Sequence, residues 1–185
     1  MTFDRRGLAV ALAGTASLLA VPALAQQTQQ RPPAGAAGQS PQNLTGLSPD
    51  QLRMLAVEGG TFLLATARMG LEKAQRAEVK RFGQFEANEQ QGVMRAMQLA
   101  GHQLPEAQLR GEKAQMVQQL QAASGAEFDR LFLQAQNTGH QEALNVHTAI
   151  AESNGPAADR IISLLAADRV REHLIDIEML SNQRA

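Results

Sequence analysis

The chain has 185 residues, and its 17 lysines and arginines are nearly balanced by 18 aspartates and glutamates. This balance argues against a dedicated nucleic-acid surface, which needs an excess or a stripe of basic residues. Cysteine is absent, which excludes disulfides, thiol nucleophiles and thiolate metal ligands.

The first 25 residues are typical of a cleaved signal peptide. Arg5 and Arg6 form a basic start, an alanine-rich apolar stretch covers residues 8–24, and Ala23-Leu24-Ala25 is a cleavage site of the A-x-A type. Cleavage after Ala25 leaves a chain without a transmembrane span, in the periplasm or secreted. The paired arginines are also similar to a twin-arginine export signal, so the Sec and twin-arginine routes both stay open.

Residues 26–47 are rich in glutamine, proline, glycine and alanine and have almost no large apolar side chains. Such a segment cannot bury enough apolar surface to fold, so it is predicted to be a disordered linker. The folded domain is predicted to cover residues 48–182. It begins at Ser48-Pro49-Asp50, where a serine N-cap, a proline at the first helical position and an acid in the first turn mark a helix start.

Apolar residues recur at helical spacing through the rest of the chain, and no stretch alternates as a strand does. The spacing predicts long helices over residues 49–74, 77–100, 127–153 and 157–182. A shorter helix is predicted to begin at Pro105 or Gly111 and to end near residue 123. The fold is therefore predicted to be an all-α, up-and-down four-helix bundle with a short extra helix in the middle connection.

Three of these helices carry more specific predictions. In the first, Gly59 and Gly60 are expected to mark either close packing of a neighbouring helix or a bend. Residues 127–151 have an apolar face that covers more than half of the helix circumference, which indicates contact with several neighbours. The inward side chains of the last helix are predicted to be Ile161, Leu164, Leu165, Ile175 and Met179.

Several residues could carry metal chemistry because acids fall on the predicted apolar faces of three helices. A buried carboxylate is costly unless it is paired, hydrogen-bonded or bound to a cation. Together with nearby histidines, these acids are candidate ligands for zinc, copper or iron. The candidate metal residues are His140, His147, His173, Glu86, Glu142 and Glu172.

A purely structural interpretation competes with the metal site. The acids would then pair with Arg68, Arg169 or Arg171, or extend to solvent where the bundle opens. His140 and His173 would be hydrogen-bonded residues at the edge that link two helices. This interpretation is favoured at the sequence level, because isolated histidines in helical cores are usually structural.

Three segments carry a family resemblance: AEVKRFGQF at 77–85, GAEFDRLFLQAQNTGHQEAL at 125–144 and REHL at 171–174. Together they resemble an exported bacterial family of unknown function with a ferritin-like fold, often labelled as an outer-membrane protein. The resemblance covers about residues 52–180 and implies a ferritin-like bundle with a role in envelope stress.

Individual positions both keep and depart from the pattern of that family. His140 and His173 match two of its recurrent histidines. Glu89-Gln90 stand where the family usually has an Asp-His pair, and Asp168 stands where it often has proline.

A ferritin-like fold raises the hypothesis of a di-iron carboxylate site, which needs Glu-x-x-His on two helices. The residues three positions before the four histidines are Leu99, Asn137, Leu144 and Val170, so the motif is absent. No G-x-S-x-G elbow for a nucleophilic serine is present either.

The sequence therefore predicts a non-enzymatic protein that acts by binding or scaffolding, without a cofactor. The alternative is a metal-binding or metal-dependent redox protein that uses a divalent transition metal. A third hypothesis is self-association with other copies of the chain.

Overall fold

The computed structural model describes residues 44–183, which belong to one compact unit. The predicted signal peptide (residues 1–25) and most of the predicted linker (residues 26–47) lie outside the described residues. At the end of that linker, Leu44 and Leu47 close a turn and pack against the core. Packed residues therefore begin slightly before Ser48.

The described part of the chain forms helices and no strands, as predicted. The helices are α1 (Pro49–Lys73), α2 (Ala77–Leu99), α3 (Gly111–Ala122), α4 (Gly125–Glu152) and α5 (Ala157–Asn182). Ser48 caps α1 as predicted, because its side chain accepts a hydrogen bond from the backbone N–H of Gln51. None of these helices combines the length and the apolar composition that a membrane crossing requires.

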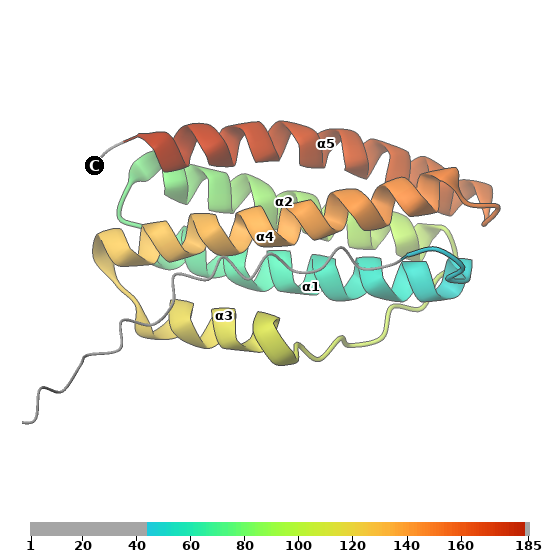
Figure 1. The fold of residues 1–185 in the computed structure, drawn as a ribbon, viewed down its shortest axis with the longest axis horizontal. Coiled ribbons are helices and arrows are strands. Elements are labelled where there is room, and N and C mark those ends of the chain that lie inside the picture. Colours follow the sequence, from blue (N-terminus) through green and yellow to red (C-terminus); the bar gives the residue numbers. More distant parts are fainter. Residues whose placement is uncertain (1–43, 184–185) are drawn as a thin grey trace, which may run out of the picture. The chain divides into compact units, whose positions relative to one another are not determined.

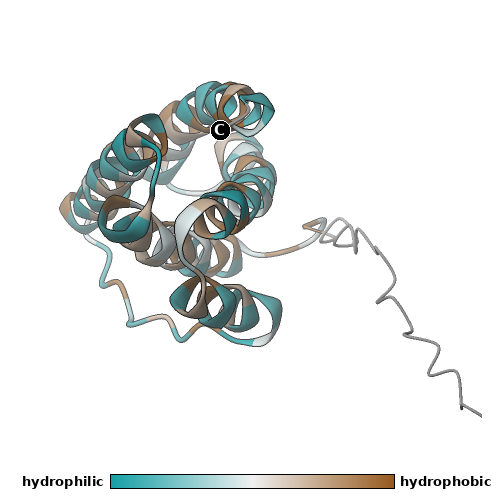
Figure 2. Ribbon diagram, turned by 90° about the vertical axis from the view of Figure 1, so that its left-hand side faces the viewer, coloured by the Kyte–Doolittle hydropathy of each residue, from teal (hydrophilic) through white to brown (hydrophobic). Residues whose placement is uncertain are grey.

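The long helices form two antiparallel hairpins, α1 with α2 and α4 with α5, as the colours along Figure 1 show. Between the hairpins, residues 100–124 run back along the bundle and include α3, so α2 and α4 point in the same direction. The predicted up-and-down order therefore holds within each hairpin but is wrong across the middle connection. At the edge of the bundle, α3 packs on α1 and α4 (Figures 1 and 2).

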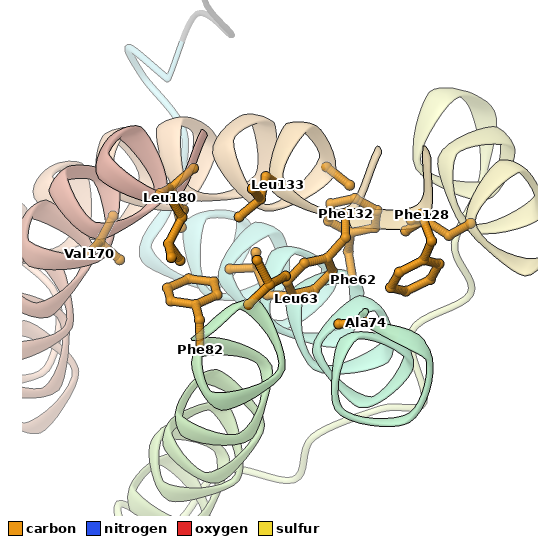
Figure 3. Packing of buried hydrophobic residues seen from close by; sticks show 14 residues of the cluster. Phe62, Leu63, Ala74, Phe82, Phe128, Phe132, Leu133, Val170 and Leu180 are labelled. Atoms are coloured by element: carbon orange, nitrogen blue, oxygen red, sulfur yellow. The ribbon is translucent and has the colours of Figure 1, made fainter. Parts of the chain in front are cut away.

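A core of large phenylalanines joins the two hairpins. Phe62 of α1 packs with Phe128 and Phe132 of α4, and all three are fully buried (Figure 3). Phe82 of α2 lies beside Phe132, with the ring centroids 6.2 Å apart. Each such ring contributes roughly 2–3 kcal/mol through its buried apolar surface. These rings lie on the faces that helical periodicity predicts.

The helices α1 and α2 approach each other closely at Gly83. A Cβ atom built on this residue would lie only 2.9 Å from the carbonyl oxygen of Ala67 and from the backbone nitrogen of Leu71. The backbones of the two helices therefore meet without a side chain between them. Gly59 and Gly60 do not bring two helix backbones together in this way. A Cβ built on Gly59 would have no heavy atom within 4 Å, and one built on Gly60 would meet only side-chain atoms of Gln90 and Met94.

The predicted inward face of α5 is wrong. All five apolar residues assigned to it are exposed by 52–65%: Ile161, Leu164, Leu165, Ile175 and Met179. The side chains that α5 turns into the bundle are mostly smaller or polar, among them Ser163, Ala166, Ala167 and His173. Small side chains allow α5 to pack closely on α4, so the buried side of this helix is not its most hydrophobic side.

Candidate metal site

Glu86 of α2, His140 of α4 and His173 of α5 converge inside the bundle, and their potential ligand atoms all lie within 4.8 Å of one another. Glu86 Oε2 is 2.8 Å from His173 Nδ1 and 3.3 Å from His140 Nε2. The two ring nitrogens are 3.1 Å apart. Glu86 and His140 are fully buried, and His173 is 7% exposed. Three ligating atoms from three helices thus face one point.

The orientation of His140 is set from within its own helix. Its Nδ1 lies 2.7 Å from the carbonyl oxygen of Gln136, one turn earlier in α4. Since a carbonyl oxygen only accepts, Nδ1 carries a proton and donates it. In the neutral ring that a metal ion would bind, Nε2 then has a free lone pair that faces Glu86 and His173. This is the tautomer that a metal ligand requires.

The other two residues of the cluster are held by their neighbours on α2. Glu89 Oε2 lies 3.2 Å from His173 Nε2, on the side of the ring away from the cluster. Gln90 Nε2 donates a hydrogen bond of 2.9 Å to Glu86 Oε1, which leaves Glu86 Oε2 facing the histidines. Outer contacts of this kind, especially a carboxylate behind a histidine, orient the ligands of metal ions in proteins.

The electrostatics of the cluster are those of a buried ion pair. Burial alone raises the pKa of a carboxyl group, but hydrogen bonds and charges from His140 and His173 outweigh it and lower the pKa of Glu86 to about 2. Burial alone lowers the pKa of an imidazole, but Glu86 and Glu89 raise the pKa of His173 to about 9. In the absence of metal, a protonated His173 therefore donates from Nδ1 to a charged Glu86.

The size of the cluster fits a metal ion. Metal–ligand bonds of about 2.0–2.1 Å with tetrahedral angles place neighbouring ligand atoms about 3.3 Å apart. The three separations between Glu86, His140 and His173 are 2.8, 3.1 and 3.3 Å, so a small expansion would admit the ion. Phe82 packs against both rings, at centroid distances of 6.2 and 5.4 Å, and gives the site an apolar wall.

The remaining predicted ligands lie elsewhere. His147 is buried two turns after His140 in α4, and its Nδ1 is 3.1 Å from Ser163 Oγ. Glu142 pairs with Lys113 of α3 at 2.7 Å. The inward placement of Glu172 is wrong, because its side chain is 64% exposed and pairs with Arg169. The structure thus brings together three of the six candidates.

Sequence reasoning missed the supporting residues of the site. Glu89 and Gln90 follow Glu86 by three and four positions, and this spacing places all three on one side of α2. Gln136 precedes His140 by four positions, but only its backbone carbonyl contacts the histidine ring. No side-chain pattern could have revealed that contact.

His147 provides a test of burial through the pH dependence of stability. Desolvation lowers the pKa of His147 to about 4, against about 6.5 in an unfolded chain. Below pH 6.5 the unfolded state binds a proton that the folded state cannot take up. The free energy of unfolding of metal-free protein should therefore fall by about 2 kcal/mol between pH 7.5 and 5 through this group alone.

Urea titrations of the wild type and of His147→Leu, each at both pH values, measure this effect. Between the two pH values, the change in stability of the variant should differ from that of the wild type by about 2 kcal/mol. His173 acts in the opposite direction in both proteins, because its raised pKa of about 9 adds stability as the pH falls, so the test is the difference between the proteins. An equal change in both proteins would contradict the assignment. The carboxylate of Glu86 does not interfere, because it affects stability only as the pH falls below about 4.5, towards its folded pKa of about 2.

The fold and this cluster define the class of protein as an all-α bundle with a buried group of one glutamate and two histidines that could hold a metal ion. A family model described as "Domain of unknown function (DUF4142)" matches residues 33–178. The chain belongs to this family, which confirms the predicted membership of a family of unknown function. Comparisons with the curated proteins and with the solved structures gave no match.

Proposed function

We propose that this protein binds a divalent transition metal ion through Glu86, His140 and His173. The observation that carries the proposal is the convergence of three ligating atoms, from three helices, within 3.3 Å of one another. Each of these atoms offers a lone pair to a cation once the protons that the metal-free cluster holds between them are released. A cation in their place would be bound by all three atoms at once.

The donor set indicates the kind of metal. Two imidazole nitrogens and one carboxylate oxygen suit zinc, iron or copper, whereas magnesium and calcium prefer oxygen ligands alone. The three protein ligands leave at least one coordination position for water or for another ligand. His140 would bind through Nε2 and His173 through Nδ1, because the other nitrogen of each ring already contacts a hydrogen-bond acceptor.

We propose a binding role in preference to catalysis, because Glu86 and His140 are fully buried. The single long connection between the two hairpins is the topology of ferritin-like bundles, which supports the ferritin-like relationship that the sequence implies. The signal-peptide pattern of residues 1–25 supports export, and we place the binding function in the periplasm or outside the cell.

Metal titration of chelator-treated protein tests the proposal. Calorimetry with Zn²⁺, Cu²⁺ and, under anaerobic conditions, Fe²⁺ should show one strong site per chain for at least one of these ions. Free metal at 100 times Kd should stabilise the fold by about 2.7 kcal/mol, which is measurable as a rise in Tm. Mg²⁺ and Ca²⁺ should give neither heat nor a thermal shift.

Matched variants locate the site. His140→Gln should weaken binding by about 100-fold or more, because it removes a ligand and not merely its support. His147→Leu should bind as the wild type does, since this buried histidine of the same helix lies outside the cluster. Absence of both heat and thermal shift with all three ions would refute the proposed function, and equal affinity in His140→Gln would refute the assigned site.

Scaffolding is the second candidate function, and the exposed apolar side chains of α5 favour it. They are available for contact with another protein, independently of any metal.

A further inference from the structure

The outer face of α5 has the residue spacing of a coiled-coil seam. We define this face as Ile161, Leu165, Asp168, Glu172, Ile175 and Met179, which follow one another at alternating spacings of four and three residues. Its four apolar side chains are 52–65% exposed. Figures 1 and 2 show α5 at the edge of the bundle, where it contacts α2 and α4. The opposite side of α5 is the one that the bundle buries.

The order of residues on this face is symmetric about Val170. Ile161 and Met179 each lie nine positions from it, and Leu165 and Ile175 each lie five positions away. Asp168 and Glu172 lie two positions away on either side. An identical helix that runs in the opposite direction therefore offers an apolar residue opposite each apolar residue, and the charged centre opposite the charged centre.

We propose that a second copy of this chain occupies the outer face of α5, with the two helices antiparallel about a two-fold axis near Val170. Such an interface is isologous, because the same patch is used by both copies. The layers formed across it are Ile161 with the partner's Met179 and Leu165 with the partner's Ile175. Each layer occurs twice, once on either side of the axis.

Charge balance at the centre supports a second copy as the occupant. Arg171 pairs with Asp168 at 2.6 Å and Arg169 pairs with Glu172 on the surface of the single chain. In the antiparallel arrangement Asp168 lies opposite the partner's Glu172, and the four arginines of the two chains lie beside these four carboxylates, so the patch meets its own copy without net charge. A shift of the helices along each other would place carboxylates against Leu165 or Ile175. The charged layer thus also fixes the register, as polar layers do in coiled coils.

The ends of the interface are apolar and extend beyond α5. Met179 lines a shallow groove between α5 and α2, together with Phe85, which is 59% exposed. In the antiparallel arrangement, the partner's Ile161 lies opposite Met179 and therefore beside this groove. The dimer would cover Phe85, which is exposed in the single chain.

The charged centre also lies next to the candidate metal site. Arg169 Nε is 3.2 Å from Glu89, and the same carboxylate contacts His173 Nε2. A second copy at this position would cover the outer edge of the metal site. The dimer does not depend on metal, because the apolar layers and the charge pattern belong to the protein alone.

Light scattering on a sizing column tests the proposed dimer. Purified protein should elute with twice the mass of one chain at micromolar concentrations. Leu165→Glu should weaken the dimer by at least about tenfold and yield the monomer mass, because each dimer contains this layer twice. Met54→Glu is the matched control, since Met54 is 49% exposed but belongs to α1, which packs mainly on α2, α3 and α4 rather than on α5. A monomeric wild type, or a Leu165→Glu variant that stays dimeric, would refute the proposal.

Cysteine cross-linking tests the antiparallel geometry, and the natural chain contributes no background because it has no cysteine. A mixture of Leu165→Cys and Ile175→Cys chains should form a disulfide between the two variants upon oxidation, since these residues lie opposite each other. Leu165→Cys alone should not cross-link, because its two copies would lie about 15 Å apart along the helices, beyond disulfide reach. Efficient cross-linking of Leu165→Cys to itself would show a parallel arrangement and overturn the proposed geometry.

Discussion

Replacement of Gly83 by alanine is expected to destabilise the folded protein by about 2–3 kcal/mol. Alanine normally stabilises the interior of a helix relative to glycine, by about 0.5–1 kcal/mol. At this position, however, the new methyl group would lie 2.9 Å from two backbone atoms of α1. Backbone atoms in the middle of a helix cannot turn aside as the end of a side chain can. The substitution must therefore push α1 and α2 apart.

The effect should also reach the metal site, because Glu86 lies one turn after Gly83 in α2. A displaced α2 moves the carboxylate away from His140 and His173, which are held by other helices. We therefore expect Gly83→Ala to weaken metal binding as well as stability. Urea unfolding measures the first effect, and the metal titration described above measures the second.

The matched control is Gly92→Ala in the same helix. No heavy atom lies within 4 Å of a Cβ built on Gly92, so alanine there meets open space. This control should stabilise the protein by about 0.5–1 kcal/mol through helix propensity. The same substitution in one helix is thus expected to have opposite signs at two positions. A Gly83→Ala variant as stable as the wild type would show that α1 and α2 can separate at little cost.

The helices could be predicted from the sequence because their signals are local. Ser48, Pro49 and Asp50 mark the start of α1, and the apolar period of α4 holds over most of its length. The direction in which one helix runs relative to another is not set by local sequence. The connection between α2 and α4 contains a short helix, but nothing in its composition states that it crosses the whole length of the bundle. The predicted order of the helices failed there.

The face of α5 was predicted wrongly because this helix has two stripes, and size and hydrophobicity favour the outer one. Ser163, Ala166 and Ala167 are buried because they are small enough for close packing on α4, and a count of hydrophobic residues undervalues them. The same error placed Glu172 inside the bundle. His173 is the next residue, about 100° around the helix, and belongs to the buried stripe.

Replacement of one member of the buried cluster should cost far more stability than replacement of all three. His173→Leu leaves the buried carboxylate of Glu86 without its closest charge partner, at 2.8 Å. Removal of one partner of a buried ion pair costs about 3–5 kcal/mol, because the remaining charge is neither solvated nor paired. We expect a loss of about 3 kcal/mol in metal-free protein at pH 7, measured by urea unfolding.

The triple variant Glu86→Leu, His140→Leu and His173→Leu should instead be as stable as the metal-free wild type, within about 1 kcal/mol, or more stable. Leucine fills a volume similar to that of glutamate or histidine, and well-packed apolar residues often replace a buried ion pair at no cost. If so, the coupling between the three positions is large, and the cluster does not stabilise the fold.

This comparison separates the metal site from the structural interpretation of the same residues. A cluster kept for stability should make the triple variant weaker than the metal-free wild type by several kcal/mol. A cluster kept for metal should show its benefit only when the ion is added, as stabilisation of the wild type that the triple variant lacks. The burial of Glu86 and His140, costly without a cation, is then explained by the ion that they bind. A destabilised triple variant together with a wild type indifferent to metal would assign the three residues to the fold alone.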